Sequence, residues 1–359
     1  MKKKILLAGW GYPPDIDGGL DIHVKHLFDE LQKRDVEVDL AVPEERAPDR
    51  EDVIGVETGE GDMVAQAREM SSEIASLAEN YDIIHTHDWF GAEAGFKARK
   101  YSGCAWISTV HSLDSGRSHE SLGGEVSKME EVAVVEPDRT LTVSEKLAEE
   151  VENEYGLKPE VVHNGFSTPE GKGKDIKEEL KIQEDMIFFV GRHAEQKGIE
   201  HLIYGFKKFI KNGEATLVVG GDGEMRKSLE KFSEMLGIDD KIVFPGFIPS
   251  DELGDYYSSA DLFVSPSINE PFGLTISEAL ESGTPVVATE SVVSELVSDD
   301  MIVDVDPNSD SIAEGIREGL NKGEVSVDGR SWSEMAEEIL EVYDSVGKPA
   351  SFQASSPPS

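Results

Sequence analysis

The chain has 359 residues, more than a single hydrophobic core usually organises, so its length predicts two domains. Its composition, 38% hydrophobic and 30% charged, is typical of a folded protein in water, and no apolar run approaches the roughly 20 residues that span a membrane. The 73 acidic residues against 34 basic ones give a net charge of −39, which argues against nucleic acid or an anionic membrane as a partner.

The cysteine content and the first residues indicate a cytoplasmic protein. Cys104 is the only cysteine, which excludes an intramolecular disulfide and a multi-cysteine zinc site. The apolar run after Lys2-Lys3-Lys4 is too short for a signal peptide and predicts a first buried strand. The acidic residues are spread along the chain, which suggests the hypothesis of a protein adapted to high salt.

Short β-branched runs alternate with amphipathic stretches, a pattern that predicts an α/β fold with parallel sheets. We expect strands, in chain order, at Lys4-Ala8, Val36-Val42, Asp82-Thr86, Trp106-Val110, Arg139-Val143, Met186-Val190, Thr216-Val219, Lys241-Phe244, Asp261-Val264 and Pro285-Ala288. We expect helices at Leu20-Lys33, Met63-Glu79, Gly91-Tyr101, Glu125-Val134, Glu145-Tyr155, Ile199-Lys211, Glu224-Leu236, Asp251-Ser259, Leu274-Ser282 and Trp332-Val346.

The two halves are separated by a polar, glycine-containing stretch after Asn164-Gly165. We predict a first doubly wound domain over residues 1–165 and a second over residues 166–330. Residues 331–347 then form a last helix, and residues 348–359, rich in Ser and Pro, form a disordered tail.

The loop after the strand that ends at Val264 carries the most informative residues. In open parallel sheets, ligands bind beyond the carboxyl ends of the strands. Gly273 precedes a helix whose first N–H groups favour a phosphate. Glu278 lies one turn into this helix, where its carboxylate could accept both hydroxyls of a ribose, and Glu270 lies before it.

Two further loops carry candidate phosphate contacts. Arg192 and Lys197 lie in a loop bounded by Gly191 and Gly198, where two cations can bind a diphosphate without a metal. The paired glycines Gly18-Gly19 begin the first helix and permit close backbone contact with a phosphate or sugar.

The chain also contains a set of short motifs that are found together in one known family. They are Pro13-Pro14, Gly18-Gly19-Leu20, His85-Thr86-His87-Asp88-Trp89, Thr109-Val110-His111, Val143-Ser144, Asn164-Gly165, Gly191-Arg192, Gln196-Lys197-Gly198 and, most specifically, Glu270-Pro271-Phe272-Gly273-Leu274-Thr275 with Glu278. The chain thereby resembles, over nearly its whole length, the retaining glycosyltransferases of family 4 and the related glycogen and starch synthases. The resemblance implies the GT-B fold, in which two doubly wound Rossmann-like domains face each other across a cleft.

The resemblance also implies roles for individual residues. Arg192 and Lys197 would bind the diphosphate, Glu278 the ribose, and Glu270 the donor sugar, with His111 beside the anomeric centre. The other implied donor contacts come from Gly18, Gly19, Asn164, Gly191, Gly246, Phe247, Phe272, Gly273, Leu274 and Thr275. No metal is implied, and the acceptor is expected to bind residues 112–124, which include Arg117 and His119.

The function implied is metal-independent transfer of a hexose, glucose by preference, to a sugar or glucan acceptor with retention of configuration. The departing diphosphate would deprotonate the acceptor on the same face of the sugar. Two departures from the family pattern are Asp17, where glycogen synthases carry a lysine, and Ser291-Val292-Val293-Ser294-Glu295, where many members have a second glycine pair.

Rival interpretations remain open. A nucleotide-sugar epimerase or a phosphorylase would share the GT-B fold, as would a non-catalytic sugar-nucleotide binding protein. His85-Thr86-His87 resembles half of a metal site, but strand-end structure or pocket lining is the preferred interpretation. We discount the triplets Asp15-Ile16-Asp17 and Asp304-Val305-Asp306 as metal motifs because they arise readily in so acidic a chain. We expect His23 and His26 to be exposed or at the edge of the core.

Overall fold

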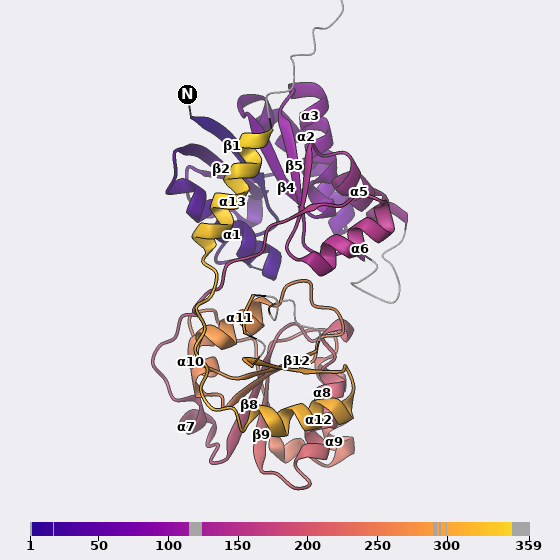
Figure 1. Ribbon diagram of the computed structural model, residues 1–359. Helices are drawn as coiled ribbons and strands as arrows, with labels where there is room; N and C mark the ends of the chain where they lie inside the picture. The colour runs from indigo at the N-terminus through magenta and orange to yellow at the C-terminus, as the bar shows by residue number, and fades with distance from the viewer. Residues whose placement is uncertain are drawn as a thin grey trace, which may run out of the picture. The chain divides into compact units, whose positions relative to one another are not determined.

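The computed structural model describes residues 2–16, 18–114, 124–289, 293, 296–298 and 300–346. These residues form two compact units, one that runs to Asn164 and resumes at Trp332, and one that spans residues 165–331. Each unit is built on one parallel sheet with helices between the strands, so the predicted α/β fold class is confirmed (Figure 1). Within the described ranges, none of the helices combines the length and the apolar character that a membrane span requires.

The sheet of the first unit has the strand order β3-β2-β1-β4-β5-β6-β7, and all its neighbours pair in parallel. The order reverses direction between β1 and β4, which is the place where open α/β sheets bind ligands. The strands are β1 (Lys3–Ala8), β2 (Val36–Pro43), β3 (Val53–Val56), β4 (Ile83–His87), β5 (Ala105–Val110), β6 (Arg139–Thr142) and β7 (Glu160–Val161).

The helices of the first unit begin where the sequence offers suitable caps. The Asp62 side chain accepts a hydrogen bond from the N–H of Ala65, and the Ser144 side chain accepts one from Leu147, as good N-cap residues do. The helices are α1 (Gly19–Gln32), α2 (Met63–Leu77), α3 (Ala92–Ser102), α5 (Gly124–Val135), α6 (Glu145–Tyr155) and α13 (Trp332–Ser345).

The sheet of the second unit has the order β10-β9-β8-β11-β12-β13, also parallel, with its reversal between β8 and β11. Its strands are β8 (Asp185–Val190), β9 (Ala215–Gly220), β10 (Ile242–Gly246), β11 (Leu262–Ser265), β12 (Val286–Thr289) and β13 (Ile302–Val305). Its helices are α7 (Ile176–Leu180), α8 (Ile199–Phe209), α9 (Arg226–Leu236), α10 (Leu253–Ser259), α11 (Leu274–Glu281) and α12 (Ser309–Gly319).

Every strand and helix that the sequence predicts is present, and the prediction misses β3, β7, β13, α7 and α12. The glycines of α12 weaken its helical pattern but allow close packing. A Cβ at Gly315 would lie 2.5 Å from Val305 Cγ1, and a Cβ at Gly205 of α8 would lie 3.0 Å from Ile312 of α12. These glycines therefore let α12 approach both the sheet and α8.

The last helix, α13, belongs to the first unit and lies alongside α1 (Figure 1). The His26 ring stacks on the Trp332 ring with centroids 4.3 Å apart, and the Arg34 guanidinium donates to the Ser333 carbonyl oxygen at 2.7 Å. At the other end of α13, Lys3 Nζ donates to the Tyr343 carbonyl oxygen at 2.5 Å. These contacts join the end of the described chain to its first strand and helix.

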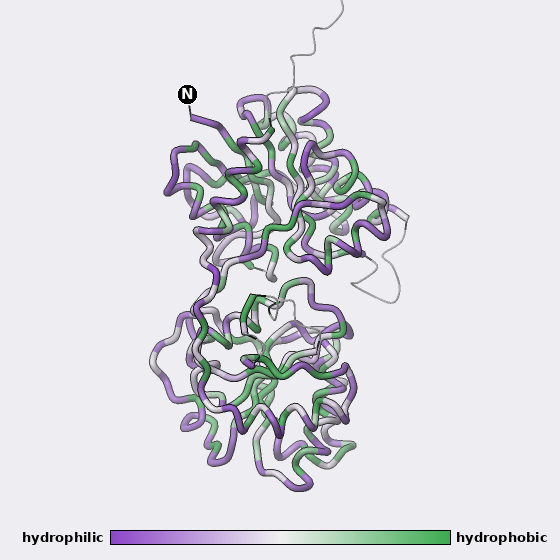
Figure 2. Tube along the Cα trace, in the orientation of Figure 1, coloured by the Kyte–Doolittle hydropathy of each residue, from purple (hydrophilic) through white to green (hydrophobic). Residues whose placement is uncertain are grey.

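The core of each unit lies between its sheet and its helices. Figure 2 shows the central strands as hydrophobic and the outer turns as hydrophilic. Strands β1 and β9 are buried along nearly their whole length, as expected for parallel strands covered on both faces. The loops at the strand ends are therefore carried on rigid supports.

Candidate active site

In the second unit, two predicted loops meet at the point where the strand order reverses. The loop after β8 holds Gln196, whose carbonyl oxygen accepts a hydrogen bond from the N–H of Ile268 in the loop after β11, at 2.8 Å. Gly198 has a φ of +61°, and a Cβ there would lie 2.2 Å from the Pro266 carbonyl oxygen. A glycine is therefore required where the two loops touch.

This contact brings together two of the predicted catalytic residues. Lys197 Nζ lies 2.7 Å from Glu270 Oε2, and the Ser267 hydroxyl donates to the same carboxylate oxygen at 3.1 Å. The two side chains are 27% and 11% exposed, so the pair is partly withdrawn from water while one side of it stays accessible. Both residues are predictable from their sequence motifs, but their ion pair is not.

Arg192, the other predicted cation, lies in the same loop and is exposed. The described part of the chain supplies no ion pair to its guanidinium. Its neighbour His193 is fully buried, with its Nε2 3.2 Å from the Gly220 carbonyl oxygen. Arg192 and Lys197 thus place two positive charges in the loop that follows the carboxyl end of β8.

Helix α11 begins at the predicted phosphate position. Gly273, its N-cap, has a φ of +96°, and none of the described side chains caps the helix. The N–H groups of Leu274 and Thr275 stand in the first helical turn, where helices leave donors unsatisfied and where the helix dipole favours an anion. Phe272, a predicted donor contact, is buried edge-on against Phe166, so it could meet a ligand mainly through its backbone.

Glu278, the predicted ribose contact, is buried one turn into α11. Its side chain accepts a hydrogen bond from the Tyr257 hydroxyl of α10 at 2.8 Å. Burial raises the pKa of the Glu278 carboxyl to about 7, although the Tyr257 hydrogen bond acts in the opposite direction. The carboxyl is thus balanced between its neutral and charged forms near neutral pH.

The structure adds a glycine loop after β9 that sequence analysis did not single out. Gly221 has a φ of +103°, and a Cβ there would lie 2.0 Å from the Gly191 carbonyl oxygen. Its N–H donates to the Gly246 carbonyl oxygen at 2.8 Å. The run Gly220-Gly221-Asp222-Gly223 directly after an apolar strand was the available signal. It holds the predicted Gly191 and Gly246 together and leaves Phe247 76% exposed beside them.

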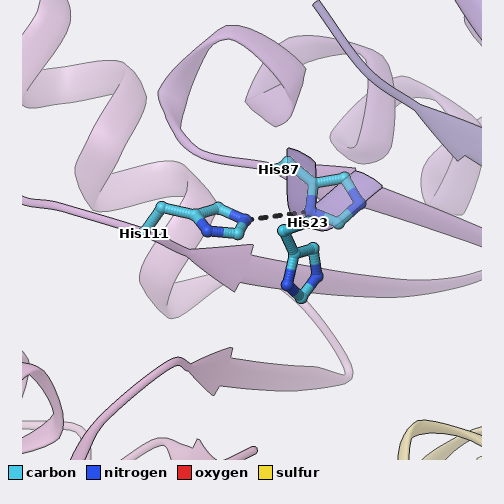
Figure 3. Close-up of side chains that lie close together, drawn as sticks. All are labelled: His23, His87 and His111. Carbon is cyan, nitrogen blue, oxygen red and sulfur yellow. Dashed lines mark hydrogen bonds between the residues drawn. The ribbon is translucent and has the colours of Figure 1, made fainter. Parts of the chain in front are cut away.

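In the first unit, predicted residues gather at the carboxyl ends of β4 and β5. The backbone N–H of His111 donates to Asp88 Oδ1 at 2.6 Å, and His111 Nε2 lies 3.2 Å from Nδ1 of His87. Asn164 is buried, and its Oδ1 lies 2.7 Å from Nδ1 of His23. His111, a predicted donor-side residue, thus belongs to a cluster of three histidines, His23, His87 and His111 (Figure 3), and Asn164, another predicted donor contact, contacts the same cluster through His23.

The expectation that His23 is exposed or at the core edge is wrong, because its side chain is 1% exposed. His23, His87 and His111 come from α1, the end of β4 and the residue after β5, and their rings converge (Figure 3). Burial lowers the pKa of His23 to about 4 and that of His87 well below its usual range, so both imidazoles are neutral near pH 7. His85 lies behind them, with its Nδ1 2.8 Å from the Tyr343 hydroxyl.

Of the remaining predicted positions, two lie at the start of α1 and the others lie outside the described residues. Gly19 begins α1 and Gly18 caps it in an extended conformation, and no atom of the described residues beyond its chain neighbours lies within 4 Å of a Cβ built at Gly18. Asp17, Arg117, His119 and the 291–295 stretch, apart from Val293, lie outside the described residues, as does the predicted tail at 348–359.

Within the described ranges, the group of side chains that could hold a metal ion is His23, His87 and His111. One ring nitrogen of each lies within 4.8 Å of the others. Of the two aspartate triplets, the described residues Asp15, Asp304 and Asp306 belong to no such group, and Asp17 lies outside the described residues.

Comparisons with known proteins agree with these observations. A family model described as glycosyl transferases group 1 matches residues 172–340, and one described as glycosyltransferase family 4 matches residues 17–169. An uncharacterized glycosyltransferase of Methanocaldococcus jannaschii is 32% identical, over 95% of this chain and 97% of that protein. The alpha-maltose-1-phosphate synthase of Mycolicibacterium smegmatis is 28% identical, over 93% of this chain and 97% of that protein.

Solved structures show the same fold. Sucrose-phosphate synthase from Thermosynechococcus elongatus matches with a TM-score of 0.79 at 20% identity, over 96% of this chain and 99% of that one. The catalytic domain of starch synthase IV from Arabidopsis thaliana, solved with ADP and acarbose, matches with a TM-score of 0.75 at 17% identity, over 96% and 99%. The predicted GT-B fold is thereby confirmed.

Proposed function

The chain belongs to the glycosyltransferases of group 1 and family 4, and from this membership we propose that it transfers a hexose from a nucleoside-diphosphate sugar to a sugar or glucan acceptor. In the proposal the hexose is glucose, the anomeric configuration is retained and no metal ion takes part. The class of the enzyme, a hexosyltransferase that acts on nucleotide sugars, is supported at the level of the family. The finer points rest on the site.

The observation that carries the proposal is the Lys197–Glu270 ion pair next to the uncapped start of α11. A diphosphate needs positive charge and backbone donors, which Lys197, Arg192 and the first turn of α11 can supply. A sugar whose anomeric carbon gains positive charge needs a nearby carboxylate, which Glu270 can supply. Because these groups are adjacent, one donor molecule could contact all of them.

In the proposed reaction, the bond between the anomeric carbon and the diphosphate oxygen breaks, and the charge that develops on the diphosphate is stabilised by Lys197 and Arg192. An acceptor hydroxyl forms the new bond on the same face, and its proton passes to the departing diphosphate. Glu270 stabilises the oxocarbenium-like sugar and does not attack it. The role of His111 beside the anomeric centre stays a prediction.

The choice of glucose is supported by a relative's name. Maltose is a disaccharide of glucose, and the alpha-maltose-1-phosphate synthase aligns over 93% of this chain. Other relatives are D-inositol 3-phosphate glycosyltransferases, which indicates that acceptors vary within the family. We therefore propose a small sugar or a glucan as the acceptor.

The test is a product analysis with a panel of nucleoside-diphosphate hexoses and of free and phosphorylated sugars and glucans. Mass spectrometry should show an acceptor heavier by one hexose, and NMR should show the donor's anomeric configuration in the new bond. An isomerised donor without a heavier acceptor would indicate an epimerase. Release of a sugar phosphate on addition of phosphate would indicate a phosphorylase, and binding without any product would leave a sugar-nucleotide binding protein.

A further inference from the structure

The histidine cluster of the first unit, His23, His87 and His111, contains imidazole rings that the proposed reaction does not use. His111 is the only one of the three rings with a predicted role in transfer, yet His23 and His87 beside it are buried more deeply than His111. Nε2 of His23 and Nε2 of His87 are both enclosed by protein, and neither has a hydrogen-bond partner among the described residues. A buried polar atom without a partner destabilises a fold, so Nε2 of His23, which lies in a cluster of possible metal ligands, requires an explanation.

The hydrogen bonds assign a lone pair to His23. The Asn164 side-chain oxygen, 2.7 Å from His23 Nδ1, can only accept, so Nδ1 carries the proton and Nε2 carries the lone pair. Histidines that bind metals usually donate their other ring N–H to an oxygen in this way, which fixes the ring orientation. Asn164 thus fixes the orientation of the His23 ring, as hydrogen-bond partners of metal-binding histidines do.

The spacing of the other two rings suits a metal. Nδ1 of His87 and Nε2 of His111 are 3.2 Å apart. Zinc–nitrogen bonds of about 2.0–2.1 Å in a tetrahedral site place neighbouring ligand atoms roughly 3.3 Å apart. One ring nitrogen of each of the three histidines lies within 4.8 Å of the others, so modest ring rotations would bring three nitrogens to the corners of a tetrahedron.

We propose that His23, His87 and His111 bind a divalent transition metal of the Zn²⁺ type, and that the bound ion withholds the His111 imidazole from sugar transfer. Three imidazole nitrogens without a carboxylate in the group favour Zn²⁺ over Mg²⁺ or Ca²⁺, which prefer oxygen ligands. When the ion binds, the single proton between His87 Nδ1 and His111 Nε2 moves to the outer nitrogen of the ring that carries it, so each ring keeps one proton and both inner nitrogens offer a lone pair. The site goes beyond the proposed function, and only its inhibitory effect rests on that function.

Metal binding is tested on the full chain, stripped with a chelator and kept in molar KCl so that the acidic surface is screened. Calorimetry with ZnCl₂ should show one tight site in the wild type. We expect His23→Gln to weaken it by at least about tenfold, because one of three ligands is lost. The matched controls, His85→Gln in the same histidine row and His193→Gln in the second unit, should leave the affinity unchanged.

X-ray absorption of the zinc-loaded wild type provides a test that needs no variant. Three imidazole nitrogens at about 2.0–2.1 Å would support the site. A shell of carboxylate oxygens, or a zinc affinity that His23→Gln leaves unchanged, would overturn it and indicate binding by surface carboxylates.

The inhibitory effect is measured separately. Stoichiometric Zn²⁺ should slow sugar transfer by the wild type at least about tenfold, a chelator should restore it, and His23→Gln should resist inhibition relative to its own rate. Binding without inhibition would overturn the effect on His111 while leaving the site intact. If the chain transfers no sugar at all, the calorimetry and absorption experiments still decide whether the site exists.

Discussion

At the scale of single residues, the contact between Lys197 and Glu270 is the feature on which the proposed reaction depends most. Sequence analysis named both residues because of their motifs, but their separation of 73 positions hid the ion pair. The pair forms because β8 and β11 are neighbours in the sheet and their loops touch at Gly198. Only the strand order could reveal this.

We predict that Glu270→Ala, Arg192→Ala and Lys197→Ala each lower kcat by at least about a hundredfold, because each removes charge that stabilises the transition state. Steady-state kinetics with donor and acceptor would measure the change. Circular dichroism should show an intact fold in all three variants.

Lys208→Ala is the matched control for these variants. Lys208 lies in the helix that follows the same loop, and it pairs with the exposed carboxylate of Asp310 at 2.7 Å. Its removal should leave kcat near the wild-type value. Near-wild-type turnover in any two of the three site variants would overturn the site assignment.

Glu278 leads to a prediction about stability and pH. Its pKa is about 7 in the folded protein, against 4.5 as the ordinary value. Between these values the folded protein holds a proton that the unfolded chain has lost, so this group's contribution to the free energy of unfolding falls as pH rises. Glu278→Gln should remove that fall and stabilise the protein at pH 8 by about 1–3 kcal/mol.

Urea unfolding of both proteins at pH 5 and pH 8 would measure this difference. Glutamine can still accept the Tyr257 hydrogen bond, so the local packing is kept. A gap between variant and wild type that does not widen from pH 5 to pH 8 would show that Glu278 ionises normally.

For His23, the sequence pattern indicates burial but not the residues that the side chain contacts. On the first helix, positions 24, 27, 28 and 31 are apolar and buried, and position 23 falls on the same stripe at helical spacing. The sequence therefore contained a signal that His23 faces inward. The contact of His23 with His87 and His111 could not be predicted, because it depends on the strand order of the sheet, which the sequence does not show.

At the scale of elements, glycines decide how closely the loops approach. Gly198→Ala should lower the free energy of unfolding by about 1–3 kcal/mol, since the new Cβ would clash with the Pro266 carbonyl in a left-handed conformation. Gly237→Ala is the matched control, because Gly237 has a similar φ of +67° but nothing within 4 Å of a Cβ. It should cost only about 1 kcal/mol.

Chemical unfolding of the two glycine variants side by side would test this. Gly198→Ala should also reduce sugar transfer, because the loops carrying Lys197 and Glu270 would separate. Equal stabilities for the two variants would mean that the loop contact is looser than the structure indicates.

Most elements were predictable because their apolar periodicity is strong, and the exceptions have physical causes. Strands β3 and β7 are too short to show a period, and Asp304 interrupts the apolar residues of β13. In α12 the glycines that permit close packing also dilute the helical pattern. The loop after β9 was missed because a glycine run signals a turn without saying what the turn touches.

At the scale of the whole molecule, the net charge of −39 is the dominant physical property. Dispersed carboxylates repel one another, and salt screens that repulsion over about 10 Å at 0.1 M and about 3 Å at 1 M. Under the hypothesis of adaptation to high salt, the midpoint of thermal unfolding should rise from low to molar KCl. A midpoint that stays flat or falls across this range would rule the hypothesis out.

The measurement that tests the proposed function most directly is release of nucleoside diphosphate with and without an acceptor. We predict release that requires the acceptor, matches the gain of hexose by the acceptor mole for mole, and is largely lost in Glu270→Ala but kept in Lys208→Ala. Acceptor-independent release, or no release across broad panels of donors and acceptors, would contradict the assignment of sugar transfer to this chain.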